Sequence, residues 1–262
     1  METRRAPART KPQLQKRTKP MKNPTAAMLV IGDEILSGRT RDANMHHLAG
    51  ELIGRGIRLR EVRIVPDERA RIVDAVNALR RSNDHVFSSG GIGPTHDDIT
   101  ADAVAAAFGV EIGVRDDARA LLAAHYERTG LELNPARLRM ARIPTGAELI
   151  ENPVSAAPGF TLGNVHVMAG VPAIFQAMLA SILPRIAGGD PLLSQMIDVG
   201  RGEGDIATPL GVLAEKFPDL SFGSYPYLRN GAHGTQIVVR GTDAGKLDAA
   251  MVELSRLVGR DE

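Results

Sequence analysis

The chain has 262 residues, 43% of them hydrophobic, which is enough for one large domain or two modest ones with an apolar core. It has no cysteine, which excludes disulfides, thiol catalysis and cysteine metal sites, and its 3% of aromatic residues argue against nucleic-acid recognition by base stacking. No run approaches the roughly 18 apolar residues of a membrane span, and no apolar signal core follows the basic start. We therefore expect a cytoplasmic protein that binds neither membrane nor nucleic acid.

The formal net charge of +1 hides an uneven distribution of charge. Residues 1–24 contain eight basic residues, four prolines and one acidic residue, which leaves 24 basic and 30 acidic residues in 25–262. We interpret residues 1–24 as a disordered basic leader. The alternative is a tether for an anionic surface or for nucleic acid.

The first predicted element is a strand at 26–31, an unbroken apolar run typical of the centre of a parallel sheet. Gly32, Asp33 and Glu34 follow directly, so a tight turn with two carboxylates lies at the carboxyl end of this strand. Open α/β sheets bind their ligands at this position. The alternative is that Asp33 or Glu34 caps the following turn.

The next elements bring a further carboxylate to an equivalent position. Apolar residues at helical spacing predict a helix over 42–54. Its adjacent His46 and His47 point about 100° apart, which prevents them from chelating one ion, so we place them at the surface or at the rim of a substrate site. A second strand is predicted at 57–65, and Asp67 lies just beyond it. Asp67 either begins the next helix in a structural role or belongs to the site.

The stretch from Ser88 to Thr100 carries the strongest prediction of function. A short apolar run leads into three glycines within four residues, Gly90, Gly91 and Gly93, and an alanine-rich run follows. This is the layout of a buried strand, a glycine turn and a helix start. Glycines let the backbone approach a ligand closely and turn its N–H groups towards it, which favours a phosphate.

The acidic residues of the same stretch indicate a metal ion. Asp97 and Asp98 would repel a phosphate unless a divalent cation such as Mg²⁺ lies between them. Thr100 is expected to cap the following helix. His96 either acts as a general acid, contacts the phosphate, or is simply paired with the aspartates. We interpret the stretch as a metal-assisted phosphate site, and the alternative is a purely structural glycine turn.

The order strand, helix, strand, helix, strand, helix predicts an α/β fold with a doubly wound parallel sheet. On that geometry Asp33, Asp67 and Asp98 lie along one edge. The glycine turn is not a P-loop, because no Gly-Lys-Ser/Thr follows it, and His96 stands where a dinucleotide fingerprint needs its third glycine.

The middle of the chain continues this pattern. A surface helix is predicted over 115–130, with Leu121 and Leu122 facing inward, followed by a short basic helical segment over 134–141. A hairpin is predicted over 160–168. Gly170 then forms another strand-to-helix turn that brings backbone N–H groups to the same edge, and Pro172 suits the first position of a helix that ends near 183.

The character of the chain changes near residue 190. Strands are predicted at 196–199, 220–223 and 235–240, and helices at 206–217 and 245–258. This unit has no glycine-phosphate loop of its own, so we interpret it as a small α+β subdomain that supports oligomerisation or covers the site, although Arg229 and His233 are candidates to touch a ligand. The expected division is a leader (1–24), an α/β domain (25–187) and a small subdomain (188–262).

Five segments resemble one known family, and they are 32–39 with Asn44, 90–100, 151–160, 170–172 and 222–227. Together they are similar to the competence/damage-inducible protein A family. The first part also resembles the wider molybdopterin-binding superfamily, which includes molybdopterin adenylyltransferases and the front domain of eukaryotic FAD synthases. The resemblance implies a three-layer αβα sandwich with a mostly parallel sheet, followed by a small α+β subdomain. The deamidase domain of longer family members is absent from this sequence, so we do not expect that activity.

The resemblance also implies a function and a set of site residues. Members are associated with metal-dependent hydrolysis of ADP-ribose to AMP and ribose 5-phosphate. The implied catalytic residues are Asp67, Asp97 and Asp98, and the implied metal ligands are Asp33, Asp97 and Asp98. The implied substrate-binding residues are Gly32, Glu34, Asn44, Ser89, Gly90, Gly91, Gly93, Pro94, Thr95, Gly170 and Pro172.

Two alternatives stay open. One is molybdopterin binding, with or without adenylyl transfer in molybdenum cofactor biosynthesis. The other is a non-catalytic nucleotide-sensing or scaffold protein. In every case we expect a small nucleotide or pterin ligand and a homo-oligomer.

Overall fold

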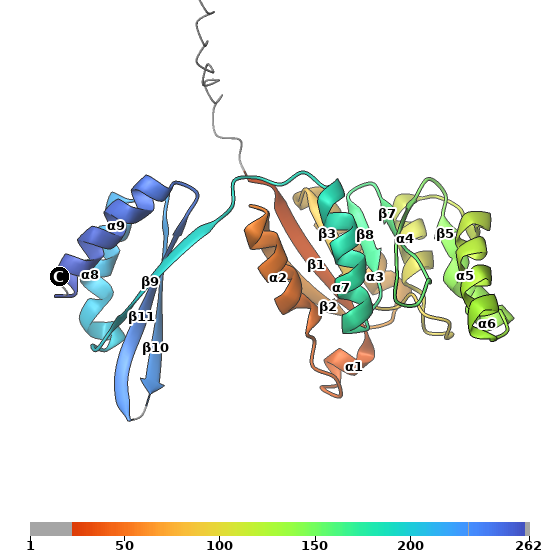
Figure 1. Ribbon diagram of the computed structural model, residues 1–262, viewed down its shortest axis with the longest axis horizontal. Helices are drawn as coiled ribbons and strands as arrows, with labels where there is room; N and C mark the ends of the chain where they lie inside the picture. The colour runs from red at the N-terminus through yellow and green to blue at the C-terminus, as the bar shows by residue number, and fades with distance from the viewer. Residues whose placement is uncertain (1–22, 230, 260–262) are drawn as a thin grey trace, which may run out of the picture.

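The computed structural model describes residues 23–229 and 231–259, so nearly all of the expected leader (1–24) lies outside the described residues. The described chain forms a large α/β unit followed by a smaller one (Figure 1). None of its described helices has both the length and the apolarity needed to cross a bilayer.

The large unit is built on a six-stranded sheet with the strand order β2-β1-β3-β8-β7-β6. Its strands are β1 (Thr25–Ile31), β2 (Arg58–Val65), β3 (His85–Ser89), β6 (Glu148–Ile150), β7 (Gly159–Leu162) and β8 (Val165–Met168). β2, β1, β3 and β8 run parallel, whereas β7 is antiparallel to both of its neighbours, β8 and β6. The predicted α/β fold with a mostly parallel sheet is therefore confirmed.

Helices cover both faces of this sheet. They are α1 (Asp33–Leu36), α2 (Asn44–Gly54), α3 (Arg69–Ser82), α4 (Thr100–Phe108), α5 (Asp116–Thr129), α6 (Pro135–Leu138) and α7 (Pro172–Ile182), with short 3₁₀ turns η1 (Arg139–Ala141) and η2 (Leu183–Arg185). An additional two-stranded sheet, β4 (Ile112–Val114) and β5 (Arg142–Pro144), was not predicted, because three-residue strands carry little periodicity.

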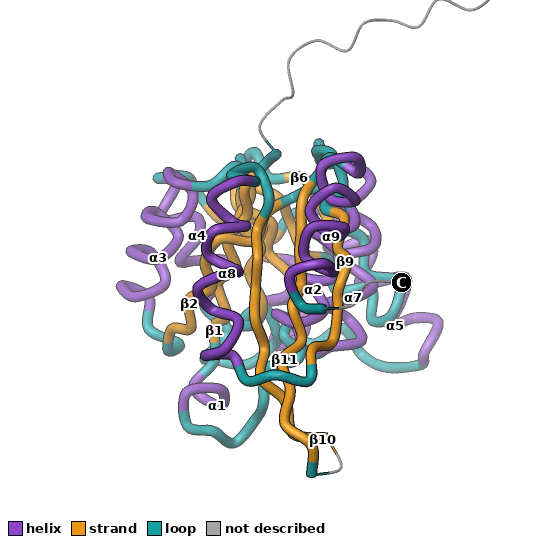
Figure 2. Tube along the Cα trace, turned by 90° about the vertical axis from the view of Figure 1, so that its left-hand side faces the viewer, coloured by secondary structure: helices purple, strands orange, loops and turns teal. Residues whose placement is uncertain are grey.

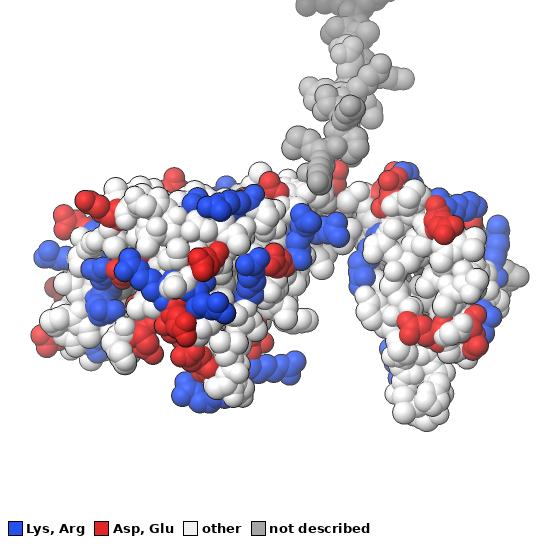
Figure 3. Space-filling model, turned by 180° about the vertical axis from the view of Figure 1, so that it is seen from behind, with Lys and Arg blue, Asp and Glu red and all other residues white. Residues whose placement is uncertain are grey.

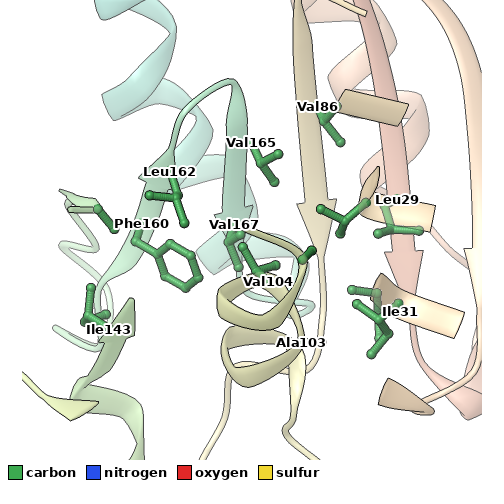
Figure 4. Packing of buried hydrophobic residues seen from close by; sticks show 14 of the residues in the cluster. Leu29, Ile31, Val86, Ala103, Val104, Ile143, Phe160, Leu162, Val165 and Val167 are labelled. Carbon is green, nitrogen blue, oxygen red and sulfur yellow. The ribbon is translucent and has the colours of Figure 1, made fainter. Parts of the chain in front are cut away.

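The alternation of side chains along β1 explains why its sequence is apolar throughout. Ala27, Leu29 and Ile31 pack into the cluster formed with α3, α4 and α5, part of which Figure 4 shows. Their neighbours Ala26 and Met28 pack on the other face, against α2 and α7. Because both faces are covered, every position of the strand after Thr25 is buried, as expected for the centre of a three-layer sandwich.

One prediction about the helix layer is wrong. Leu122 is fully buried, as expected, but the side chain of Leu121 is 46% exposed. Adjacent residues on a helix point about 100° apart, and α5 touches the core along one narrow stripe that also includes Ala118. Leu121 therefore faces solvent.

The small unit is a three-stranded antiparallel sheet with two helices on one face (Figures 1 and 2). Its elements are β9 (Leu193–Val199), α8 (Glu203–Lys216), β10 (Ser221–Arg229), β11 (Ala232–Gly241) and α9 (Ala244–Leu257). The order of elements agrees with the prediction, but the strands are longer. β10 continues through Pro226 because it lies at the edge of the sheet, where proline is tolerated. A separate core of this unit includes Ile206, Ile237 and Leu254.

Candidate functional site

The loops that follow β1, β2, β3 and β8 lie close together at the carboxyl edge of the parallel strands. Gly32 donates its N–H to the carbonyl of Val65 at 3.2 Å, which joins the ends of β1 and β2. At the other side, a Cβ on Gly170 would lie 3.3 Å from the Cα of Gly90, so the loops after β3 and β8 are in contact. The expected convergence of loops at one sheet edge is thus present.

The glycine loop requires glycine at two positions for steric reasons. Gly90 has a φ of 106°, and a Cβ there would lie 2.1 Å from the carbonyl oxygen of Ile31. Gly91 has a φ of 70°, and its Cβ would lie 2.1 Å from Oγ1 of Thr100. Neither approach is tolerated by an ordinary side chain, so the loop can take this close-packed form only with glycine.

The backbone N–H groups of the loop differ in their availability. Gly90 donates its N–H to the carbonyl of Met168 at 3.1 Å, because the pairing of β3 with β8 continues one residue beyond the strand. The expectation that Gly90 offers its N–H to a ligand is therefore wrong. The N–H groups of Gly91 and Gly93 have no hydrogen-bond partner within the described part of the chain.

Thr100 has a different role from the expected one. The residue that precedes α4 is Ile99, and Thr100 is the first residue of the helix, without a side-chain cap. Its buried hydroxyl donates to the carbonyl of Gly90 at 3.0 Å, and its N–H donates to the carbonyl of Gly91 at 3.0 Å. Thr100 therefore fastens the glycine loop to α4 instead of capping the helix.

Asp98 faces its own loop. Its Oδ2 accepts hydrogen bonds from the N–H of Thr95 at 2.7 Å and from the Thr95 hydroxyl at 2.5 Å. A Cβ on Gly93 would lie 2.6 Å from the same oxygen, so Gly93 packs directly against this carboxylate. Asp98 and Thr95 thus close the loop into a compact turn.

Four other carboxylates form an acidic cluster, which we define as Asp33, Glu34, Asp67 and Asp97. Oδ2 of Asp67 accepts the N–H of Asp33 at 3.0 Å. Burial raises the pKa of Asp67 above its ordinary value, and the negative charges of Asp33, Glu34 and Asp97 raise it further, although the hydrogen bond from Asp33 opposes them. Figure 3 shows acidic side chains gathered in the lower part of the large unit, with basic ones nearby.

The capping alternatives for the cluster are wrong. Gly32 precedes α1 and Glu68 precedes α3, and neither helix start has a side-chain cap. Asp67 therefore holds the turn after β1 instead of its own helix. Of the two aspartates of the glycine loop, Asp97 is the one whose charge acts on Asp67.

The carboxylate oxygens of the acidic cluster are the type of ligand that a hard divalent cation prefers. The negative charges of Asp33 and Asp97 act on Asp67. Among the described residues, the one ion pair that these three carboxylates form is between Asp97 and the exposed His96, at 3.9 Å. No three His, Asp or Glu side chains of the described residues come together as a preformed ligand set. Mg²⁺ is usually held by one or two carboxylates, with water and substrate phosphate as its other ligands, so this arrangement is compatible with it.

Asn44 links the loops of the site from the first turn of α2. Its buried Nδ2 donates to Oγ of Ser89 and to the carbonyl of Gly170, both at 2.7 Å. Oδ1 of Asn44 is also buried and has no partner within residues 23–229 and 231–259. Asn44 and Ser89 therefore position the ends of β3 and β8 relative to each other.

Several candidate residues lie at the rim or elsewhere. The side chain of His96 is 99% exposed. Pro94 is exposed, and Pro172 occupies the first turn of α7, as predicted. In the small unit, Arg229 forms an ion pair with Asp198 at 2.8 Å.

Two residues near the site were missed by the sequence analysis. Arg139 and Arg142, from η1 and β5, line a small cavity beside Gly91 and Gly93. The basic character of 134–141 is visible in the sequence, but only the packing of η1 against the loop brings these side chains to the site. Arg139 contacts the glycine loop directly, because its Nη2 lies 3.4 Å from the carbonyl oxygen of Asp98.

Comparisons with known proteins match both units. Residues 27–188 match the family described as "Probable molybdopterin binding domain", and residues 191–261 match "FAD synthase, middle domain". A CinA-like protein of Geobacter sp. (strain M21) is 34% identical over 252 residues, which cover 89% of this chain and 58% of that protein. A protein of Pyrobaculum arsenaticum is 36% identical over 210 residues, covering 77% and 79%. This chain therefore spans less than two thirds of the CinA-like relative.

A solved structure also resembles the large unit. It is the crystal structure of the protein CinA, with unknown function, from Thermoplasma acidophilum, at 34% sequence identity and a TM-score of 0.57. The match covers 63% of this chain and 99% of that one.

Proposed function

This chain belongs to the probable molybdopterin-binding-domain family and is a CinA-like member of it, and from that premise we propose that it is a metal-dependent hydrolase of ADP-ribose or a similar nucleoside diphosphate derivative. The observation that carries the proposal is the acidic cluster beside a glycine loop with two N–H groups that lack a partner within the described residues. Carboxylates attract cations, whereas backbone N–H groups attract anions. A diphosphate that carries a divalent cation offers a partner to both.

The proposal gives different roles to the glycines and to the carboxylates of the site. Gly91 and Gly93 donate N–H groups to phosphate oxygens. Asp97 and Asp33, with Asp98 at the turn, would hold the cation. A divalent cation bound there supplies a Lewis acid and lowers the pKa of the attacking water. Asp67, with its raised pKa, accepts the proton of that water.

The experiment is release of AMP from ADP-ribose by the purified chain with Mg²⁺, Mn²⁺ or Co²⁺, measured by chromatography. We expect turnover with at least one of these ions and none after chelation with EDTA. Absence of AMP with every ion, while the chain remains folded, contradicts the proposal.

A second candidate function is molybdopterin binding, with or without adenylyl transfer, and the match of residues 27–188 supports it. This alternative predicts that a pterin stays bound through purification and that no diphosphate is hydrolysed. Fluorescence of the denatured, oxidised extract detects the pterin. If the chain instead binds a nucleotide saturably, hydrolyses none and carries no pterin, a sensing or scaffold role is supported.

A further inference from the structure

The three-stranded sheet of the small unit has one open face. Both helices of the unit lie on the other face, where Ile197 and Ile237 belong to the core shared with α8 and α9. Figure 1 shows these helices on the side of the sheet away from the large unit, so the open face is turned towards the large unit. Side chains alternate along a strand, which places Met196 and Tyr225 on the open face. They are 61% and 47% exposed.

Two tyrosine rings on this face lie over glycines. A Cβ on Gly223 would lie 3.0 Å from the hydroxyl oxygen of Tyr225, and a Cβ on Gly234 would lie 2.5 Å from that of Tyr227. Each ring therefore occupies the space above the sheet that a side chain at the glycine would need. Glycine in a strand often marks such a close approach of another group. Because the two tyrosines are two residues apart on β10, their Cα atoms are about 7 Å apart along the same face.

Each tyrosine ring has an arginine beside it. Cζ of Arg229 lies 4.3 Å from the centre of the Tyr227 ring, and Cζ of Arg240 lies 5.9 Å from the centre of the Tyr225 ring. Arg229 also forms an ion pair with Asp198 at 2.8 Å. Arg240 has no acidic partner within the described residues, and its Nη1 lies 3.3 Å from the hydroxyl of Tyr225. The open face thus combines aromatic rings with guanidinium planes, one of them carrying an unpaired positive charge.

A groove of about 810 Å³ lies where this face approaches the large unit. Arg240 lines it from the small unit and Arg58 lines it from β2. Arg58 is exposed and, like Arg240, has no acidic partner in the described part of the chain. The groove also contains two acidic residues, but Asp219 is paired with Lys246 and Asp190 is engaged as well. The charges left to bind a partner at this end of the face are therefore positive.

The aromatic content of the whole chain conceals this arrangement. Aromatic residues make up only 3% of the sequence, which argues against base stacking. The chain has three tyrosines, however, and the fold places two of them on this one face. A low average therefore does not exclude a local stacking surface.

We propose that the open face of the small unit binds single-stranded nucleic acid, with bases stacked on Tyr225 and Tyr227 and phosphates bound by Arg240 and Arg58. Unpaired bases stack on aromatic rings and on guanidinium planes, and sheet faces are known platforms for this contact. A flat, exposed ring encloses a single nucleotide poorly, whereas a strand is held by several bases and phosphates at once. This surface is separate from the glycine loop and does not depend on the proposed hydrolase activity.

The test is fluorescence anisotropy, in EDTA, with a labelled single-stranded oligodeoxyadenylate of about 12 nucleotides. We expect Tyr225→Leu and Tyr227→Leu each to weaken binding by about 5- to 100-fold, because each removes one stacking ring and keeps an apolar side chain. Tyr225→Phe keeps the ring and should retain most of the affinity. The matched control is Tyr126→Leu, which changes the third tyrosine, on α5, and should leave the affinity unchanged.

Two further measurements separate stacking from charge. Arg240→Gln should reduce the slope of log affinity against log salt concentration by about 0.7, as expected for the loss of one phosphate contact with a single strand. A duplex of the same length should bind at least about 10-fold more weakly than the single strand, because its bases are paired. The chain has no tryptophan, so quenching of tyrosine fluorescence by the oligonucleotide reports stacking in the wild type without any variant.

Several results would overturn the proposal. They include no binding of the oligonucleotide by the wild type, equal binding by the two leucine variants, and a duplex bound as tightly as the single strand. AMP that displaces the oligonucleotide at an equal concentration of bases would identify a mononucleotide site instead. A dimer in sedimentation that Tyr225→Leu dissociates, without oligonucleotide binding, would identify the face as an interface between two copies of the chain.

Discussion

At the start of α4, the hydroxyl of Thr100 reaches back to the carbonyl of Gly90 and occupies the space that a side chain at position 91 would need. Gly91 is therefore required twice, by its positive φ and by this contact. The loop is held in this form by hydrogen bonds to the end of β8 and the start of α4, and by those between Thr95 and Asp98 within it. Preorganisation by such hydrogen bonds lets loop N–H groups face a phosphate without being ordered first.

Replacement of this glycine tests the argument. Gly91→Ala should destabilise the chain by about 1–3 kcal/mol, because alanine at this φ is strained and its Cβ overlaps Thr100. Urea unfolding measures the loss. The control is Gly50→Ala in the middle of α2, where nothing lies within 4 Å, and this change should stabilise by about 0.5–1 kcal/mol. Equal midpoints for Gly91→Ala and the wild type would show that the loop adapts.

The carboxylates of the loop are expected to affect activity and not folding. Asp97→Asn and Asp98→Asn should each lower kcat for ADP-ribose by at least about 10–100-fold, because both remove negative charge that holds the cation. The side-chain amide oxygen introduced by Asp98→Asn can still accept the hydrogen bonds of Thr95, so the loop keeps its shape. The comparison variant is Asp74→Asn on the exposed side of α3. Wild-type turnover in both loop variants would contradict the assigned roles.

Among the elements, the pairing of β3 with β8 contains the most unusual buried group. His166 on β8 contacts His85 on β3 at 3.2 Å and Thr161 at 3.0 Å, and it packs against Phe87. Burial lowers the pKa of His166 to about 3, and the pKa of His85 is lowered for the same reason. The neutral ring is thus part of the sheet and not of the glycine loop.

This pair makes stability depend on pH. The folded pKa of His166 lies below the unfolded value of about 6.5, so the unfolded chain binds the proton more readily. The stabilisation is present above pH 6.5 and is lost as the pH falls towards 3. Between pH 7 and pH 5 this one group should cost about 2 kcal/mol of unfolding free energy. Urea unfolding of the wild type and of His166→Gln should show a shallower pH dependence in the variant, and parallel curves would contradict this origin.

At the scale of the whole molecule, the two units have separate cores but are joined by an ordered connection. Asn23 donates Nδ2 to the carbonyl of Asp190 at 2.8 Å, and Gly189 donates its N–H to the carbonyl of Arg55 at 2.9 Å. A Cβ on Gly56 would lie 2.3 Å from the carbonyl oxygen of Asp190. The connection is therefore fastened to the end of α2, whereas the core of the small unit contains only its own residues.

Separate cores predict local effects of core substitutions. Leu254→Ala should leave a cavity in the small unit and cost about 2–5 kcal/mol there. In hydrogen exchange, amides of α8 and α9 should lose protection, while those of β1 and β3 stay protected. The reciprocal variant Leu29→Ala should affect the sheet of the large unit. Equal loss of protection in both units would show that they unfold as one.

The sequence alone was sufficient for the elements whose cause is local. The apolar run of β1, the glycine loop and the helix signals at Gly109 and Pro172 predicted a mostly parallel α/β sheet with its site at one edge. A local sequence pattern does not show which distant residue a loop side chain will contact in the folded chain. The tertiary structure decided that Asp97 joins the acidic cluster, that Asp98 faces Thr95 and that Thr100 holds the loop. It also brought Arg139 to Asp98, 41 residues away, because such contacts depend on how distant segments pack and not on the periodicity of either one.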